Sequence, residues 1–422
     1  MPTRGCEAEV ALSVDHLFRR QAGQMVATLT RIVGVENLDL VEDAVQDALV
    51  QALKQWPFHG VPANPRAWIV QVAKNRVVDQ LRRRTTWVGK SRQLLHELER
   101  LPEGGMDDVA FGRELADDQL RLIFVCCHPA LSRDSQVALT LNLVGGFSAE
   151  EVARAFLARR PAMAQRLVRA KRRLRDENVR FDMPVAAELE ARLSAVLEVL
   201  YLMFNEGYGA HSGDDLVRRD LCQEAIRLVL LVCDHPVIAA PEADALAALL
   251  LFQGSRLATR VDAEGDLLLL AEQDRSLWDR SMQRQAALFL ARAGRGQQLS
   301  TYHLEAEIAA CHALAPDYEA TDWRRILDCY DALVERYPSP VVELNRLVAL
   351  AEVEGAEAAL GPSAELARGA LADYYPAHVI RGELLSDLGD RTAAGRSLER
   401  ALELAASAPV RRHLERRLAA LA

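Results

Sequence analysis

The chain has 422 residues, half of them apolar, and a net charge of −9; this length exceeds one ordinary core and predicts two to four domains. The charge is uneven, because residues 1–183 carry +4 and residues 184–422 carry −13. Such a balance indicates that only the first half meets nucleic acid. The seven cysteines fit no disulfide framework, and no apolar run is long enough to cross a membrane. We therefore expect a soluble, cytoplasmic protein that is neither exported nor anchored.

Helical periodicity runs through the whole chain, and Ala, Leu, Arg and Glu dominate, which predicts an all-α fold. In the first domain, residues 10–85, we expect helices over residues 10–33, 40–56 and 66–84. The Pro-rich stretch "PFHGVPANP" separates the last two as a loop. The polar residues 86–115, which include "LPEGGMDD", are predicted to be a linker.

The second predicted domain, residues 116–180, has the outline of a helix-turn-helix. Gly145 and Gly146 end one helix, and the next begins at Ser148 with Glu151 three residues later, the pattern of a capping box. After a short turn, Pro161 stands at the start of the following helix, where its missing N–H costs nothing. The second helix of this motif is therefore expected to begin near residue 160.

That last helix, "PAMAQRLVRAKRRLR", carries six Arg or Lys residues and no acidic residue. Met163, Leu167, Ala170 and Leu174 form its apolar face. A solvated charged face is the alternative, but the capped helix and tight turn before it favour DNA binding, in which arginines contact phosphates and release counterions. Gln165 and Arg169 lie one turn apart, and both side chains are able to bond base edges.

The first domain contains an acidic ridge and a second basic helix. In "VEDAVQDALVQALKQW", Asp43 and Asp47 are four residues apart opposite an apolar stripe. In "KNRVVDQLRRR", Val77, Val78 and Leu81 are expected to face inward. A solvated face remains the alternative for the acidic ridge. Two basic helices in separate domains suit a protein that grips duplex DNA at two places.

The helical pattern of residues 185–300 predicts a helical extension. Residues 300–422 contain a degenerate repeat. Stepping back 34 residues from Gly389 reaches Gly355, and the same step from Ala401 reaches Ala367. A period of about 34 residues is typical of tetratricopeptide repeats. In the last copy, "RGELLSDLGDRTAAGRSLERALEL", small or turn residues stand where that repeat needs them, although Arg381 occupies a position that is usually apolar.

Three weaker clusters favour structural explanations over chemical ones. The thiols of "CCH" at 126–128 have no second ligand pair, so buried cysteines are preferred to a metal site. His303, Glu307 and Cys311 share a helical face, for which core packing is preferred. The stretch "FNEGYGAHSGDD" contains carboxylates but no nucleophile or phosphate loop, so a structural or partner-binding loop is preferred to acid-base catalysis. We accordingly expect no metal, no cofactor and no enzymatic activity.

Three stretches in this order, "VEDAVQDALVQALKQWP", "NPRAWIVQVAKNRVVDQLRRR" and "LTLNLVGGFSAEEVARAFLARRPAMAQRLVRAKRRLR", resemble bacterial extracytoplasmic-function sigma factors. The resemblance covers about residues 10–180. The remainder looks like the subgroup with a tetratricopeptide-like C-terminal extension, and "LYLMFNEGYGAHSGDDLVRRDLCQEAIRL" is similar to the start of that extension. The resemblance implies a factor that joins core RNA polymerase and directs it to promoter DNA at the −35 and −10 elements.

The resemblance also implies roles for individual residues. The surface that docks on polymerase takes Asp43, Gln46, Asp47 and Trp56. The helix beside the −10 element takes Lys74, Asn75, Arg76, Asp79, Arg82 and Arg83. The −35 major groove takes Gln165, Val168 and Arg169 as base contacts, with Arg160, Arg166 and Arg172 on phosphates. Arg159 and Ala162 replace the family's usual Pro and Thr, so no promoter sequence is assigned.

For the acidic C-terminal half, our hypothesis is regulation in cis, by shielding the basic helices or by offering a repeat surface to a protein or small-molecule partner. Two other functions stay open. One is a helix-turn-helix regulator that never joins polymerase. The other is a tetratricopeptide adaptor or ligand sensor in which the first half plays no part.

Overall fold

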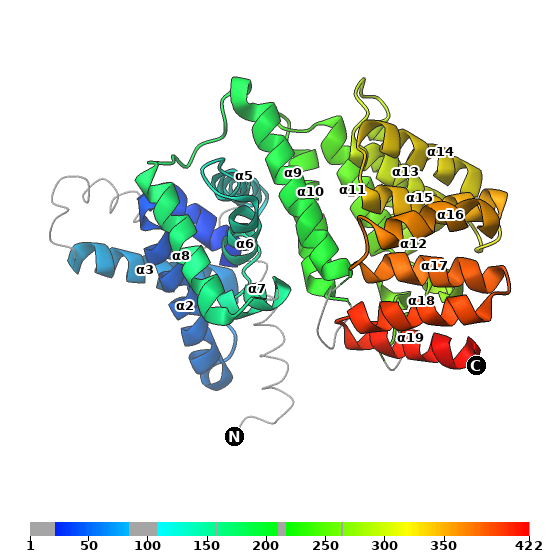
Figure 1. The fold of residues 1–422 in the computed structure, drawn as a ribbon. Coiled ribbons are helices and arrows are strands. Elements are labelled where there is room, and N and C mark those ends of the chain that lie inside the picture. The colour runs from blue at the N-terminus through cyan, green and yellow to red at the C-terminus, as the bar shows by residue number, and fades with distance from the viewer. Residues whose placement is uncertain (1–21, 84–107, 157, 210–216, 263–264, 422) are drawn as a thin grey trace. The chain divides into compact units, whose positions relative to one another are not determined.

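The computed structural model describes residues 22–83, 108–156, 158–209, 217–262 and 265–421 (Figure 1). In these ranges the chain is helical and has no strand, and Val261 and Leu267 form an isolated bridge. The predicted all-α fold is confirmed. The chain divides into two compact units, Met1–Leu200 and Tyr201–Ala422, each of which is described separately.

The first unit begins with helical residues 22–33, which end where expected, because Gly34 has a φ of 87° and donates its N–H to Thr30 O. A 3-10 turn and two long helices follow: η1 (Val35–Asn37), α2 (Leu38–His59) and α3 (Pro65–Arg83). α2 extends past Pro57 into the predicted loop. A proline so near the end of a helix removes only one hydrogen bond, and Gly60, with a φ of 82°, then turns the chain.

α2 and α3 pack against each other along faces that the sequence spacing sets. Small residues at four-residue intervals, Ala44, Ala48 and Ala52, are completely buried on α2. Ala73 and Val77 are the equally buried counterparts on α3. Small side chains let two helix axes approach closely, so this pair is held by direct packing.

The rest of the first unit contains the helix-turn-helix. Its helices are α5 (Asp108–Cys126), α6 (Arg133–Leu143), α7 (Ala149–Ala155) and α8 (Arg160–Asp176), followed by the start of α9 (Ala186–Tyr208). α5 begins inside the stretch predicted as a linker, of which residues 86–107 lie outside the described residues. The predicted capping box is present: Ser148 N–H donates to Glu151 Oε2 at 2.8 Å, and Glu151 N–H donates to Ser148 Oγ at 3.2 Å.

Residues 22–33 are joined to α5 and to the end of α6 by polar and backbone contacts. Arg31 Nε donates to Asp118 Oδ2 at 3.0 Å, which ties residues 22–33 to α5. Gly23 lies so close to Val144 that an added Cβ would sit 2.0 Å from the Val144 carbonyl oxygen. Residues 22–59 and the helix-turn-helix therefore form one packed body.

The second unit is a stack of helices. Its elements after α9 are α10 (Arg219–Asp234), α11 (Pro241–Gly254), η2 (Leu257–Thr259), η3 (Leu270–Glu272), η4 (Arg275–Leu277), α12 (Arg280–Ala293), α13 (Thr301–Leu314), α14 (Trp323–Arg336), α15 (Pro340–Glu354), α16 (Ala356–Arg368), α17 (Tyr375–Asp387), α18 (Arg391–Leu404) and α19 (Ala408–Leu421). α11 is buried almost all round and forms the centre of this unit's first half. From α13 onward, consecutive helices pack on their neighbours as hairpins (Figure 1).

The hairpins recur at nearly the predicted interval. α14, α16 and α18 begin at Trp323, Ala356 and Arg391, which are 33 and 35 residues apart. Between α17 and α18, Gly389 has a φ of 82°, and Asp390 caps α18 by accepting from the N–H of Ala393. The structure thus contains helix pairs with the expected spacing and turn chemistry, while their assignment to the tetratricopeptide type stays a prediction.

The last helices return to the beginning of the second unit. Leu414 and its neighbours on α18 and α19 form an apolar cluster with Val217, Val261 and Leu267. Two arginines of α19 reinforce it: Arg412 pairs with Asp266, and Arg416 Nη1 lies 3.2 Å from Asp266 Oδ2. The C-terminal end of the stack is therefore anchored to residues that precede α12.

Candidate polymerase and promoter surfaces

The acidic ridge lies on the outer face of α2. Asp43 and Gln46 are exposed, and Asp47 forms a 2.6 Å ion pair with Arg76 of α3. Burial of part of the Asp43 carboxyl, together with the neighbouring Glu42, raises the pKa of Asp43. The ridge is thus a compact group of carboxylates whose mutual repulsion a cationic partner would relieve.

Trp56 does not lie on this ridge. Only 3% of its surface is exposed, and its ring meets Trp68 of α3 edge-on at a centroid distance of 5.6 Å. The sequence contains the signal for this burial, because Trp56 continues the four-residue spacing of Ala48 and Ala52. Its position in the α2–α3 core does not fit the direct polymerase contact that the resemblance implied.

α3 presents three of its six predicted DNA residues at its surface. Asn75, Asp79 and Arg82 are exposed, whereas Arg76 is engaged by Asp47. Lys74 is 4% exposed and lies on the same face as Val77 and Val78, so it is a core residue that does not present its side chain to DNA. The side chain of Arg83 lies outside the described residues.

α8 presents a continuous polar face. Gln165, Val168 and Arg169 are all exposed, with Val168 at 58%. The apolar stripe of Met163, Leu167, Ala170 and Leu174 is buried as predicted. An exposed valine between two hydrogen-bonding side chains is unfavourable in water but suits contact with base edges.

The arginines of α8 are less isolated than the sequence indicates. Arg160 Nη1 lies 3.6 Å from Glu150, and Arg172 Nε lies 3.6 Å from Asp176. Arg166 lies 3.4 Å from Asp134 and also covers the ring of Phe156 at 5.8 Å. The basic stretch of α8 has no acidic residue of its own, but the residues just after it and neighbouring helices supply acidic partners. All these pairs are largely exposed and therefore weak.

Lys171 differs from every other cation of α8, because it is buried. Its side chain is 8% exposed, and its Nζ pairs with Glu42 and lies 3.4 Å from Asp39, both on α2. Burial alone lowers the pKa of Lys171, but the two carboxylates outweigh it and leave the pKa raised. The contact joins α8 to the first turns of α2, next to the acidic ridge, and Lys171 and Glu42 are 129 residues apart in sequence.

The weaker clusters have structural roles in the described residues. Cys126 and Cys127 are fully buried, and burial raises the pKa of the Cys127 thiol to about 12. His303 Nδ1 accepts from the Ser300 N–H at 3.2 Å, and Glu307 pairs with Arg325 at 3.0 Å. No group of three potential metal ligands occurs in the part of the chain that the structure describes. His211, Asp214 and Asp215 lie outside it.

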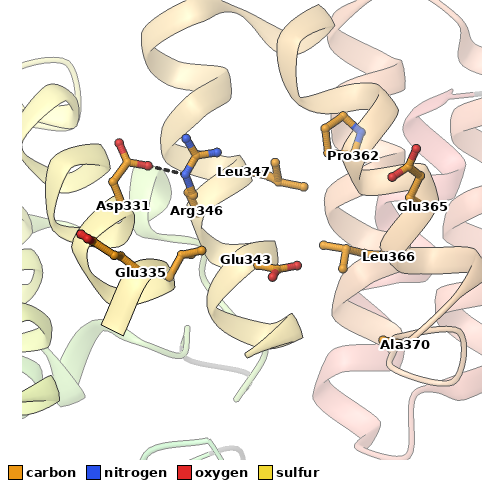
Figure 2. A pocket seen from close by; sticks show the side chains of 10 residues that line it. Asp331, Glu335, Glu343, Arg346, Leu347, Pro362, Glu365, Leu366 and Ala370 are labelled. Carbon is orange, nitrogen blue, oxygen red and sulfur yellow. Dashed lines mark hydrogen bonds and ion pairs between the residues drawn. The ribbon is translucent and has the colours of Figure 1, made fainter. Parts of the chain in front are cut away.

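The repeat region contains one sizeable hollow, shown in Figure 2. It has a volume of about 580 Å³ and lies between α14, α15 and α16 over the side chains of Leu347 and Leu366. Glu335, Glu343 and Glu365 line it, and its cation, Arg346, is paired with Asp331 at 2.5 Å. The hollow is therefore acidic with an apolar floor.

The described helices include none that is long and apolar enough to span a membrane.

Comparison with known proteins identifies the first segment. Residues 17–86, which include α2 and α3, match the family model described as Sigma-70 region 2. Residues 192–294 match a family of unknown function (DUF6596) and lie within the predicted helical extension. "Uncharacterized protein R00370" of Rhizobium meliloti (strain 1021) is 44% identical over 374 residues, which cover 88% of each chain. No solved structure is significantly similar to the chain.

The Sigma-70 region 2 match coincides with the helix pair that carries the acidic ridge and the first basic helix. Sigma-70 proteins are non-enzymatic initiation factors whose partners are RNA polymerase and promoter DNA. The chain belongs to the same family as the Rhizobium meliloti protein, and it contains a Sigma-70 region 2, the segment that characterises sigma factors of transcription initiation.

Proposed function

We propose that this protein is an extracytoplasmic-function type of sigma factor that joins core RNA polymerase in the cytoplasm and selects promoters with two helices, α3 at the −10 element and α8 at the −35 element. The match of residues 17–86 to Sigma-70 region 2 carries this proposal. A helix-turn-helix in the same unit supports it, because the second helix of such a motif enters the major groove and contacts base edges.

In this proposal α8 reads the −35 major groove. Gln165, Val168 and Arg169 contact base edges, because these side chains are exposed on one face. Arg160, Arg166 and Arg172 contact phosphates. Their exposed carboxylate partners contribute little individually, so each guanidinium exchanges an internal partner for a phosphate at small cost, and the released counterions favour binding.

α3 is proposed to lie beside the −10 element through Asn75, Asp79, Arg82 and Arg83. Arg76 reaches DNA only if it leaves Asp47, and Lys74 acts from the core by supporting the helix. On α2, Asp43, Gln46 and Asp47 form the proposed surface for polymerase, with Trp56 as a positioning residue that holds α2 against Trp68.

The C-terminal unit is proposed to regulate the factor in cis. Its support is the −13 charge of residues 184–422, opposite in sign to the first half, and the acidic hollow of Figure 2, which suits a cationic protein segment or small molecule. A separate helical stack next to a promoter-binding unit is also a common way to add a partner surface.

The experiment is in vitro transcription with purified core polymerase on a promoter library. We expect Arg172→Ala to weaken all promoters alike and to lower the salt slope of binding by about one, whereas Arg169→Ala also relaxes preference in the −35 element. Arg180→Ala is the matched control, since Arg180 is 85% exposed and pairs with Asp182, which lies two residues away. Failure of the wild-type protein to direct polymerase to any start site would reject the proposal.

Removal of Tyr201–Ala422 tests regulation in cis. A changed rate or promoter choice supports it, and an unchanged rate and choice reject it. The same assays separate the other functions. A regulator that never joins polymerase would bind a duplex operator alone and ignore Asp43→Lys and Asp47→Lys. A repeat adaptor would keep its full activity in the Arg169→Ala and Arg172→Ala variants.

A further inference from the structure

The first unit contains a cavity of about 690 Å³ that none of the proposed roles uses. One wall is the turn between α5 and α6, with His128, Pro129 and Arg133. The other is the first part of α9, whose facing residues Ala187, Ala191 and Ala195 recur every four positions. Three methyl side chains in a row leave space that larger residues would fill, so the cavity follows directly from the sequence of α9. Its size is that of a small-molecule site.

The walls of the cavity are held rigidly by hydrogen bonds. Gln136, 4% exposed, donates to the carbonyl oxygens of Cys127 at 3.2 Å and His128 at 3.0 Å. The side-chain oxygen Oε1 of Gln136 accepts a hydrogen bond from Arg133 Nη1 at 2.6 Å. Arg133 also reaches α9, where it donates to Ala195 O at 3.3 Å. A preformed cavity of this kind binds a ligand without first ordering its walls.

Of the two arginines that line the cavity, Arg133 is paired with Glu198 at 2.5 Å, whereas Arg192 is incompletely neutralised. Arg192, whose side chain is 15% exposed, donates to Phe124 O at 2.7 Å, but its nearest carboxylate, Glu188, is 3.9 Å away. Its Nε is buried and has no acceptor. A buried guanidinium with one backbone acceptor and one distant carboxylate is costly, because desolvation is repaid only by close partners.

A third polar group completes the site. His128 Nδ1 accepts from the Ala130 N–H at 3.2 Å, so in the neutral ring the proton lies on Nε2, which is a donor. Burial, followed by the nearby charge of Arg192, lowers the pKa of His128 and keeps the ring neutral at pH 7. Arg192 and His128 therefore offer donors beside the apolar surface formed by the alanines of α9, while Arg133 is held by Gln136, Ala195 and Glu198.

We propose that this cavity binds a small organic anion, a carboxylate or a phosphate ester with a compact apolar group. The anionic group lies at Arg192 and supplies the close negative charge that Glu188 does not, while the apolar group lies on the alanines of α9. A bound ligand joins α9, where the C-terminal region begins, to the α5–α6 turn of the helix-turn-helix. The proposal goes beyond the sigma function and does not depend on it, because binding requires neither polymerase nor DNA.

Isothermal titration of the full-length protein at pH 7 tests the proposal with benzoate, phenyl phosphate and uncharged benzyl alcohol. We expect one molecule of benzoate or phenyl phosphate to bind per chain, and the difference between the two identifies the preferred anion. Benzyl alcohol is expected to bind at least tenfold more weakly. Arg192→Met should weaken anion binding at least tenfold, and Arg180→Met, the matched surface control, should leave it unchanged.

A second variant, Ala191→Phe, fills the cavity without changing its charge and should also abolish binding. If circular dichroism shows that Arg192→Met has lost helicity, this variant alone decides. The proposal is overturned if neither anion binds, if benzyl alcohol binds as tightly as the anions, or if Ala191→Phe binds them like the wild type.

Discussion

The contact between Lys171 and α2 gives the sharpest test of the first unit. Lys171→Met keeps the length of the side chain and removes its charge, which leaves Glu42, 14% exposed, without its cation. Removing one member of a fully buried pair costs about 3–5 kcal/mol. Water reaches Glu42 in part, and Asp39 is 55% exposed, so we expect about 2 kcal/mol.

Hydrogen exchange with mass spectrometry is the suitable assay, because it resolves α2 and α8 from the second unit. A loss of about 2 kcal/mol corresponds to roughly 30-fold faster exchange where reclosing is fast and exchange reports the local opening equilibrium. Glu42→Gln in the same background should recover part of the loss, since the uncompensated carboxylate is then gone. Arg180→Met should leave exchange unchanged. Unaltered protection in Lys171→Met, or strictly additive effects in the double variant, would refute the reasoning.

The pH dependence of this contact has a definite sign. The folded-state pKa of Lys171 is raised, so its contribution is complete at neutral pH. It is lost only as the pH rises through that raised pKa.

Three further predictions concern local features. Burial raises the pKa of Glu305 to about 7, although its carboxyl group bonds Tyr201. The free energy of unfolding should therefore fall by about 1–3 kcal/mol as the pH rises from 5 to 8. Glu305→Gln should abolish this pH dependence, which denaturant titrations measure. Ser148→Ala removes the cap of α7 and should cost about 1 kcal/mol, seen as faster exchange in α7 with α2 unchanged. Gly382→Val should lower the thermal midpoint by the equivalent of about 1–3 kcal/mol, because a Cβ there meets Leu398 at 2.9 Å; an unchanged midpoint would contradict the packing described for α17 and α18.

Local signals in the sequence predicted several helix ends of the first unit and the turn at Gly389. The capping box at Ser148, the left-handed Gly34 and the turn at Gly389 each depend on residues within a few positions of one another. The burial of Trp56 and Lys74 was also predictable, since both continue apolar spacings on their helices. The resemblance to a family placed them on surfaces, where helical geometry alone would have placed them in the core.

Contacts between distant segments were not predictable. Lys171 continues the four-residue spacing of Met163 and Leu167, so its burial follows from helical geometry, but its partner Glu42, which lies 129 residues earlier, does not. The cavity on α9 likewise depends on which turn faces the three alanines. Periodicity defines which side of a helix is buried but not what it is buried against.

The return of α19 to residues near Asp266 changes how the C-terminal stack should respond to stress. An open array of repeats frays from its last member, because each helix pair touches only its neighbours. Here the final helix, α19, contacts residues near the beginning of the same unit, so the last member of the array has packing partners at both ends of the unit. Shortening the chain by a single helix should therefore loosen both ends of the array together.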